Sequence, residues 1–145
     1  MQFCEEFGYR PVCFTANQDV NGKRMPIYHT NVMMCIADTF AVVCLESIDN
    51  KVERDSVIET LITTGKEIIE ITQVQKSKFA GNMLQVMGDK PYLVMSTSAF
   101  NSLTDKQKGT IEKSCSIIHS SLDTIETCGG GSARCMIAEV FLPKK

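Results

Sequence analysis

A single cysteine follows a run of three glycines close to the end of the chain. Residues 129–136 read Gly-Gly-Gly-Ser-Ala-Arg-Cys-Met. Glycine accepts positive φ angles and lets a ligand approach the main chain closely, so this segment is suited to presenting Cys135 to a bound molecule. A thiolate is a strong nucleophile, and a neighbouring base is the usual means of producing it. We therefore predict that Cys135 is a candidate nucleophile.

The chain offers only two histidines as a base for this thiol, His29 and His119. His29 lies about a hundred residues upstream in the segment Tyr-His-Thr-Asn at 28–31, just before an apolar stretch. The residues alone leave structural alternatives open: His29 as a satisfied structural histidine, Cys135 as a core thiol, and His119 as a surface residue. Cys128 competes with Cys135 for the nucleophilic role, although it precedes the glycines.

The composition excludes several classes of protein. The chain has 145 residues, of which 43% are hydrophobic and 22% are charged, and its net charge is −2, which is typical of a globular domain. Its 15 basic and 17 acidic residues are interspersed, so there is no basic stripe for nucleic acid. The apolar stretches at 32–36 and 40–45 are too short to span a membrane, and the first residues lack the pattern of a signal peptide. We expect a cytoplasmic protein without nucleic-acid or membrane partners.

Seven cysteines are spread from one end of the chain to the other, and none forms a C-x-x-C pair. We predict that four of them are reduced core residues, because free cysteine is among the most buried residue types. These four are Cys13, Cys35, Cys44 and Cys115. A reducing compartment follows from that prediction. The nearest approach to a metal cluster, His119 with Cys128 and Cys135, matches none of the usual zinc spacings, and we expect neither a metal nor another cofactor.

The apolar pattern of the first half of the chain returns 51 residues later. Matched pairs at this offset are Asn31 and Asn82, Asp38 and Asp89, Val43 and Val94, and Ser47 and Ser98. The elements expected in the first copy are strands at 31–37 and 40–45 around a turn, a helix at 52–64 with Gly65 as its C-cap, and a strand at 67–71. The pattern predicts a β-β-α-β module at approximately 31–71.

The second copy predicts another β-β-α-β module at approximately 82–118. Its expected elements are strands at 83–86 and 92–95, a helix at 104–113, and a strand at 115–118. Thr104 followed by Gln107 predicts a capping box at the start of the helix. Partial modules are expected at both ends, with a helix end at 1–8 and a strand at 11–15 on one side, and a strand at 134–141 on the other. The sequence therefore predicts an α/β fold of repeated modules that starts and stops within a module.

Three segments carry a resemblance to a known family. They are residues 29–34 (His-Thr-Asn-Val-Met-Met), 79–84 (Phe-Ala-Gly-Asn-Met-Leu) and 126–136 (Glu-Thr-Cys-Gly-Gly-Gly-Ser-Ala-Arg-Cys-Met). Together they resemble the C-terminal half of the amidinotransferase-type, guanidino-group-modifying enzymes, and within that superfamily most closely the citrulline ureidases, also called citrulline utilization hydrolases. The resemblance covers essentially residues 1–145 and implies a partial pentein fold, which is an α/β propeller of five β-β-α-β modules.

The resemblance also implies roles for particular residues. Cys135 would attack the central carbon of a guanidino or ureido group, and His29 would protonate the departing amine and then activate water. The supporting or substrate-binding residues that it implies are Asn31, Asn82, Gly130 and Gly131. The implied ligand is a guanidino or ureido amino acid of the citrulline or arginine type, and the implied class is a hydrolase of non-peptide carbon–nitrogen bonds. Arg134 is a candidate partner for a substrate carboxylate, although next to Cys135 on the expected strand it would point to the opposite face.

Full members of this superfamily have an N-terminal half that contains an acidic residue, which grips the substrate's nitrogen atoms, and much of the pocket for the amino acid end of the substrate. The chain has no counterpart of that half, so we expect little or no hydrolysis of citrulline or arginine by the purified chain. Self-association or a complementing N-terminal half would rebuild the cleft. Ureidase, deiminase and amidine transfer use the same Cys/His pair and are not separated by these residues. The alternative function is that of a non-catalytic interaction fragment with the same fold.

Overall fold

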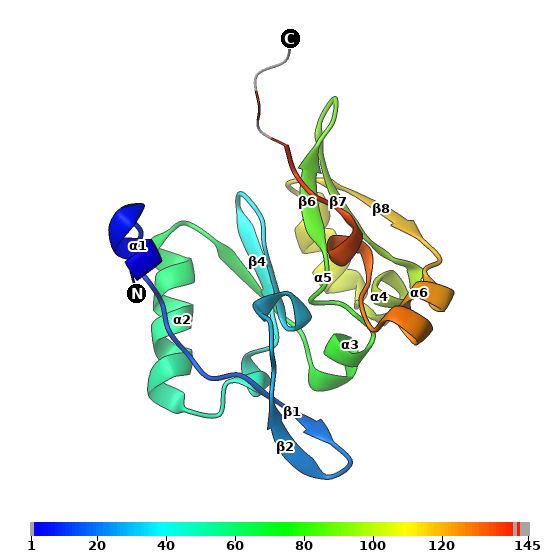
Figure 1. The fold of residues 1–145 in the computed structure, drawn as a ribbon. Helices are drawn as coiled ribbons and strands as arrows, with labels where there is room; N and C mark the ends of the chain where they lie inside the picture. The colour runs from blue at the N-terminus through cyan, green and yellow to red at the C-terminus, as the bar shows by residue number, and fades with distance from the viewer. Residues whose placement is uncertain (1, 141, 143–145) are drawn as a thin grey trace.

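The chain forms three small sheets joined by short helices (Figure 1). A computed structural model describes residues 2–140 and 142. Two of the sheets have three strands each, and the third is a two-stranded hairpin. Most of the fully buried large side chains come from the two three-stranded sheets and the segments beside them, and they include Phe40, Met33, Ile48, Ile71, Met83, Leu93, Met95 and Ile111.

The first three-stranded sheet has the order β3-β4-β5. Strands β3 (Met34–Ile36) and β4 (Phe40–Val43) are antiparallel, and β4 pairs in parallel with β5 (Glu67–Glu70). Helix α2 (Lys51–Thr63) makes the crossover that a parallel pair requires. Asn50 caps its first turn by accepting from two backbone N–H groups, and a pair of backbone bonds from Gly65 and Lys66 closes its last turn. The C-cap is Thr64, one residue before the predicted Gly65, and Gly65 follows it in the left-handed conformation with φ of 78°.

The second sheet repeats this arrangement with the order β6-β7-β8. Strand β6 (Leu84–Met87) is antiparallel to β7 (Pro91–Ser96), and β7 is parallel to β8 (Ser116–Ser120). Two short helices, α4 (Thr97–Ser102) and α5 (Asp105–Glu112), make the crossover. Thr104 and Gln107 form the predicted capping box. The fold class predicted from the repeat, α/β with β-β-α-β units, is confirmed.

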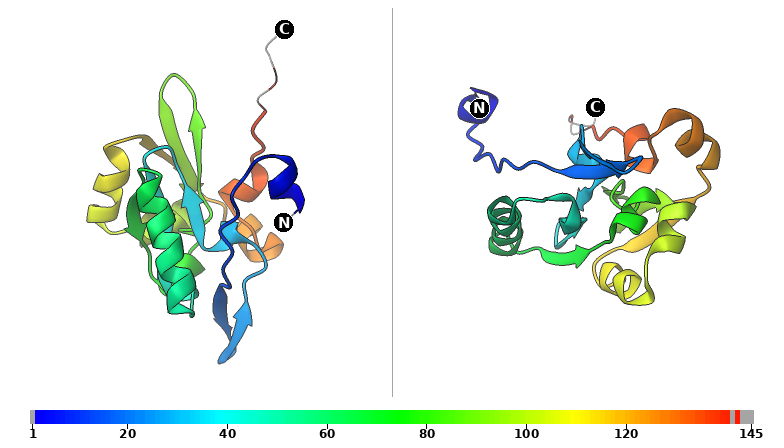
Figure 2. Two further views of the ribbon diagram at one scale, coloured as in Figure 1. Left: turned by 90° about the vertical axis from the view of Figure 1, so that its left-hand side faces the viewer. Right: turned by 90° about the horizontal axis from the view of Figure 1, so that it is seen from below.

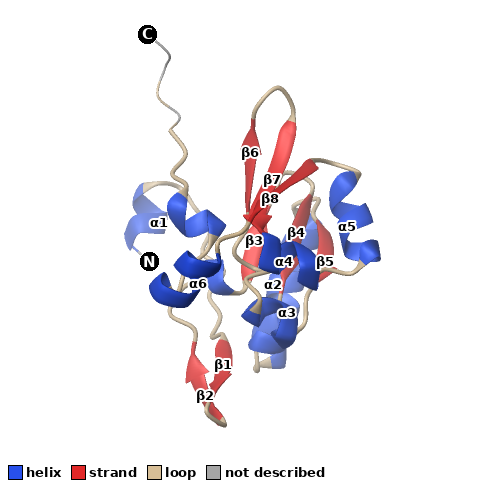
Figure 3. Cartoon of the chain, turned by 90° about the vertical axis from the view of Figure 1, so that its right-hand side faces the viewer, coloured by secondary structure: helices blue, strands red, loops and turns tan. Residues whose placement is uncertain are grey.

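The two units are joined by polar contacts as well as by their apolar core. Strand β3 lies beside β6 (Figure 3), where the backbone N–H of Asp38 donates to Gln85 Oε1 at 2.7 Å. On the helix side, Gln75 Nε2 donates to Gln107 Oε1 at 2.7 Å, and Gln107 Nε2 donates to the carbonyl of Glu70 at 2.7 Å. These bonds satisfy side-chain amides at the boundary, so the two units hold a defined relative position.

The remaining elements lie around the two sheets (Figure 2). Helix α1 (Gln2–Glu6) has no buried residue. Strands β1 (Asn17–Val20) and β2 (Lys23–Pro26) form the hairpin at the bottom of Figure 1. Helix α3 (Gln73–Ser77) connects the two units, and α6 (Asp123–Gly129) leads into the glycine run.

Several expectations about the chain ends are wrong. Residues 11–15 form no strand, and the hairpin β1–β2 lies just beyond them instead. The expected strand at 134–141 is replaced by a 3₁₀ turn, Ala133–Met136, followed by irregular chain to residue 140, because no neighbouring strand pairs with it there. Met1 and Phe141, at the outer limits of two expected elements, lie outside the described residues.

The cysteines follow the prediction at three of four positions. Cys35, Cys44 and Cys115 are buried, and burial raises the pKa of each thiol, that of Cys35 to about 12. Cys13 is exposed, because the segment that carries it runs along the surface as irregular chain. Burial makes the three core thiols poor nucleophiles at neutral pH.

Candidate active site

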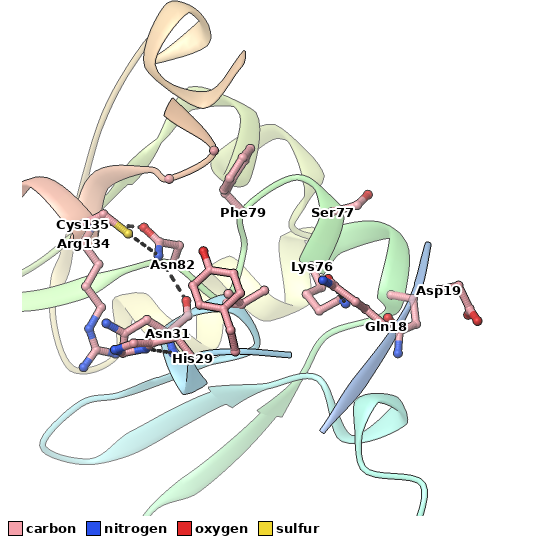
Figure 4. A pocket seen from close by; sticks show the side chains of 15 residues that line it. Gln18, Asp19, His29, Asn31, Lys76, Ser77, Phe79, Asn82, Arg134 and Cys135 are labelled. Atoms are coloured by element: carbon pink, nitrogen blue, oxygen red, sulfur yellow. Dashed lines mark hydrogen bonds between the residues drawn. The ribbon is translucent and has the colours of Figure 1, made fainter. Parts of the chain in front are cut away.

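All six residues predicted for the site line one cavity of about 650 Å³ (Figure 4). They come from three separate segments of the chain: His29 and Asn31 after the hairpin, Asn82 before β6, and Gly130, Gly131 and Cys135 after α6. Cys128 does not belong to the lining, although its side chain is exposed. The tertiary structure therefore brings Cys135 and His29 to the same cavity across about a hundred residues of sequence.

The glycine run sets the position of the thiol. Gly130 adopts a left-handed conformation, with φ of 66°, as the C-cap of α6. A Cβ on Gly131 would lie 3.2 Å from both Cβ and Sγ of Cys135, so a side chain there would crowd the sulfur. Ser132 is fully buried and donates to Glu126 Oε1 at 2.6 Å, which ties the turn back to α6. Cys135 itself is exposed to the cavity.

Asn82 connects the thiol to the opposite wall of the cavity. Its Nδ2 donates to Cys135 Sγ at 3.2 Å and to the carbonyl of Asn31 at 3.1 Å. Its Oδ1 accepts from the backbone N–H of Arg134 at 3.1 Å. The side chain is only 4% exposed. A buried amide with both of its ends occupied by hydrogen bonds is held rigidly, so it sets the distance between the cysteine turn and the histidine turn.

His29 is oriented by its own backbone neighbourhood. It precedes a 3₁₀ turn, Thr30–Val32, and its Nδ1 accepts from the backbone N–H of Asn31 at 3.1 Å. In the neutral ring the hydrogen is then carried by Nε2. Among the described residues, Cys135 Sγ has no hydrogen bond to His29. Both residues line the same cavity.

Sequence reasoning missed several residues of this cavity. Arg134 lines it together with Cys135, contrary to the expected opposite orientation, because a 3₁₀ turn does not alternate its side chains as a strand does. Its Nη1 donates to the carbonyl of Met34 at 3.4 Å. Phe79 also lines the cavity and has φ of 63°, a strained conformation for a residue with a side chain. The one sequence feature that could have indicated Phe79 as a residue of the cavity is its position in the Phe-Ala-Gly-Asn segment.

Polar residues line the other end of the cavity and had no sequence signal at all. Lys76 comes from α3, while Gln18 and Asp19 come from β1 (Figure 4). Nothing in their spacing relates them to Cys135. Among the described residues there is no group of three or more His, Cys, Asp or Glu side chains arranged to hold a metal ion, and none of the described helices has the length and apolarity needed to cross a membrane.

The repeated β-β-α-β units and the Cys/His cavity define a member of the guanidino-group-modifying, pentein superfamily. More specifically, the family model "N,N dimethylarginine dimethylhydrolase, eukaryotic" matches residues 1–142, and the chain belongs to that family. No curated protein matches the chain.

A solved structure supports the fold. The apo structure of ArgZ, an arginine dihydrolase from the ornithine-ammonia cycle in cyanobacteria, matches with a TM-score of 0.57 at 15% sequence identity. The match covers 81% of this chain and 18% of that chain. At this identity the likeness concerns the fold alone, and it confirms the predicted partial pentein architecture. The family match supports the superfamily named from the sequence motifs, whereas it does not support the finer assignment to the citrulline ureidases.

Proposed function

We propose that this domain contributes the nucleophile and the proton-transfer group to a hydrolase of carbon–nitrogen bonds in guanidino or ureido amino acids. The observation that carries the proposal is the common cavity of Cys135 and His29, with Asn82 bonded to the thiol and to the turn that follows His29. Family membership supports the same chemistry. The cavity has the size expected for a small-molecule site.

The proposed reaction has two covalent steps. The thiolate of Cys135 forms a bond to the central carbon of the guanidino or ureido group, and the carbon–nitrogen bond to the leaving amine breaks as His29 supplies a proton to that nitrogen. Water then adds to the thiouronium- or thiocarbamate-type intermediate, with its proton taken by His29. Breaking the carbon–sulfur bond releases the product and restores the thiolate. Backbone N–H groups around Gly130 and Gly131 would stabilise charge at the reacting centre.

The family name directs the substrate proposal towards N-methylated arginines, in which the leaving group is a methylated amine. Citrulline and arginine remain candidates on the three sequence motifs, and a ureidase or deiminase reaction would use the same two residues. The match spans only 18% of the solved arginine dihydrolase, so the turnover of a whole enzyme is not assigned to this chain. Labelling of the nucleophile is therefore a sharper test than turnover.

The test is site-resolved alkylation of the purified chain with 2-chloroacetamidine, a small amidinium reagent, followed by mass spectrometry of all seven cysteines. Cys135 is expected to react at least about tenfold faster than the exposed Cys13 and Cys128, because bound amidinium is held next to the thiolate. The neutral reagent iodoacetamide should show a much smaller preference. Equal reaction of the three exposed cysteines with 2-chloroacetamidine would refute the proposal.

The alternative function, a non-catalytic interaction fragment, has one observation in its favour. Phe3, Phe7 and Tyr9 are each more than 60% exposed and pack against one another on the N-terminal segment, with ring centroids of Phe3 and Phe7 4.7 Å apart. An exposed aromatic cluster is typical of a protein–protein contact. Native mass spectrometry of a stable complex that is unaffected by Cys135→Ser, together with unselective cysteine labelling, would favour this alternative.

A further inference from the structure

Lys76 is a buried cation in the wall of the cavity that holds Cys135. Its side chain is only 7% exposed. Among the described residues its ammonium group has no carboxylate within ion-pair distance, and the contact found for it is a long hydrogen bond of 3.4 Å to Gln18 Oε1. Lysine is almost never this buried unless it is paired. A bound anion, rather than a side chain of the described residues, would therefore stabilise the ammonium group of Lys76.

The backbone around Lys76 fixes the ammonium in this position. Helix α3 starts with a capping box between Thr72 and Gln75, and Gln75 is itself buried between the two β-β-α-β units. The residue that follows Gln75 is thereby directed to the cavity (Figure 4). Burial lowers the pKa of Lys76, and the positive charge of Arg24 adds to this effect, whereas Cys44 and Asp19 act in the opposite direction. An anion bound beside the ammonium would offset this unfavourable environment.

Asp19, the acidic residue in the same part of the cavity, forms no ion pair with Lys76. Asp19 also lines the cavity, but its carboxylate is bonded to Arg24 Nη1 at 3.3 Å and points away from Lys76 (Figure 4). Arg24 in turn bonds to Asp49. Asp19 and Asp49 are thus paired with Arg24, whereas Lys76 lines the cavity with no carboxylate at ion-pair distance among the described residues.

Lys76 and Cys135 lie towards different ends of the cavity (Figure 4). A guanidino amino acid has its reacting carbon at one end of a flexible chain and a carboxylate at the other. We propose that Lys76 binds the carboxylate of the substrate while its guanidino or ureido group lies at Cys135, an inference that rests on the function proposed above. Lys76 would then select amino acids over the corresponding decarboxylated amines and amides.

The experiment compares L-arginine with L-argininamide as protectants of Cys135 against iodoacetamide. The two ligands have the same chain and guanidinium, and argininamide replaces the carboxylate by a neutral amide. In the unmodified chain L-arginine should protect at a concentration at least about tenfold lower, since a charge-assisted hydrogen bond to a buried ammonium is lost with the amide. Lys76→Met should abolish the difference, and Lys78→Met, at an exposed lysine two residues further on, should preserve it.

Reaction with 2-chloroacetamidine separates this inference from the proposed function, because that reagent has no carboxylate. If Lys76→Met retains selective labelling of Cys135 but L-arginine and L-argininamide protect equally in the unmodified chain, the role of Lys76 is refuted and the proposed function stands. If neither ligand protects at any concentration, the role of Lys76 is likewise refuted. If selective labelling is absent from the unmodified chain, the proposed function itself fails. Circular dichroism of Lys76→Met checks that the variant is folded.

Discussion

At the scale of single residues, the candidate site depends on one buried amide. Asn82 donates to the sulfur of Cys135 and to the carbonyl of Asn31, and it accepts from the backbone of Arg134. A hydrogen bond donated to sulfur is stronger when the sulfur is ionised, so this amide stabilises the thiolate. Asn82 is thus a positioning residue that also donates a hydrogen bond to the nucleophile.

Asn82→Asp is the variant that separates these two roles. The carboxylate can still accept from the backbone of Arg134, but it cannot donate to sulfur, and its negative charge opposes a thiolate beside it. Alkylation of Cys135 by iodoacetamide at pH 7 should become at least about tenfold slower.

The control is Asn101→Asp, at an exposed position of α4, which should leave the alkylation rate unchanged. A purely structural role of Asn82 would instead lower the stability of the variant and leave the alkylation rate of its folded form unchanged. Unchanged alkylation of Asn82→Asp at pH 7 would contradict the proposed hydrogen bond.

At the scale of elements, the site is built where the connections of two repeated units meet. The segment before β6 carries Asn82, and the segment before β3 carries Asn31, the residue at the matching position of the first repeat. The two segments approach so closely that an added Cβ on Gly81 would lie 2.7 Å from the carbonyl oxygen of Val32 and 2.8 Å from the carbonyl carbon of Met33. These are backbone atoms, which cannot move aside as a flexible side chain can.

Gly81→Ala should therefore destabilise the fold and disturb the site together. Overpacking of this kind costs about 1–3 kcal/mol, measured as the loss of unfolding free energy in urea. Alkylation of Cys135 should slow as well, since the backbone shift moves Asn82. Gly109→Ala is the matched control: it lies within α5 with no atom in the way of a Cβ, so it should stabilise by about 0.5–1 kcal/mol. Equal stabilities of the two variants would contradict the close approach.

At the scale of the whole molecule, the hairpin β1–β2 is held to the first unit by polar contacts. Arg24 of β2 bonds to Asp49 and to the backbone carbonyl of Glu46, and Asn17 of β1 donates to Asp49 at 2.7 Å. The hydrogen bond from Arg24, followed by that from Asn17, lowers the pKa of Asp49. Because β1 contributes Gln18 and Asp19 to the cavity, this attachment also shapes the end of the site beside Lys76.

The lowered pKa of Asp49 makes this attachment sensitive to acid. A carboxylate whose pKa is lower in the folded chain than in the unfolded chain adds stability above the unfolded value, and this contribution is lost as the pH falls through the folded value. The pH range in which this stability is lost therefore lies below about pH 4. Between pH 7 and pH 3 the unmodified chain should lose more unfolding free energy than Asp49→Asn, by no more than about 1 kcal/mol because the pair is partly exposed.

Urea unfolding at the two pH values measures this difference. Asp55→Asn serves as the control, because the ion pair of Asp55 with Lys51 lies within one helix and joins no separate segments. An identical loss in the unmodified chain and in Asp49→Asn would contradict the role of Asp49.

Much of the fold could be predicted from local signals. The alternation of apolar residues, the helix end near Gly65 and the capping box at Thr104 each depend on neighbours within a few residues. The structure confirms the capping box and ends the helix one residue before the predicted cap, at Thr64. Helices α3, α4 and α6 were not predicted, since short helices at connections are stabilised by what they pack against more than by their own pattern. The strand expected after Arg134 failed for a related reason, because an apolar stretch becomes a strand only where another strand can pair with it.

The sequence by itself determined which reactive groups the site contains. It has a thiol after three glycines, an imidazole before an apolar strand, and a repeat that relates Asn31 to Asn82. Which groups share a cavity with that thiol was decided by the tertiary structure alone. Lys76 and Gln18 are 58 positions apart, and no local pattern connects either of them with Cys135. The packing of the repeated units buries Gln75 and directs Lys76, its neighbour, to the cavity. This packing alone places the ammonium group that we propose as the binding group for a carboxylate.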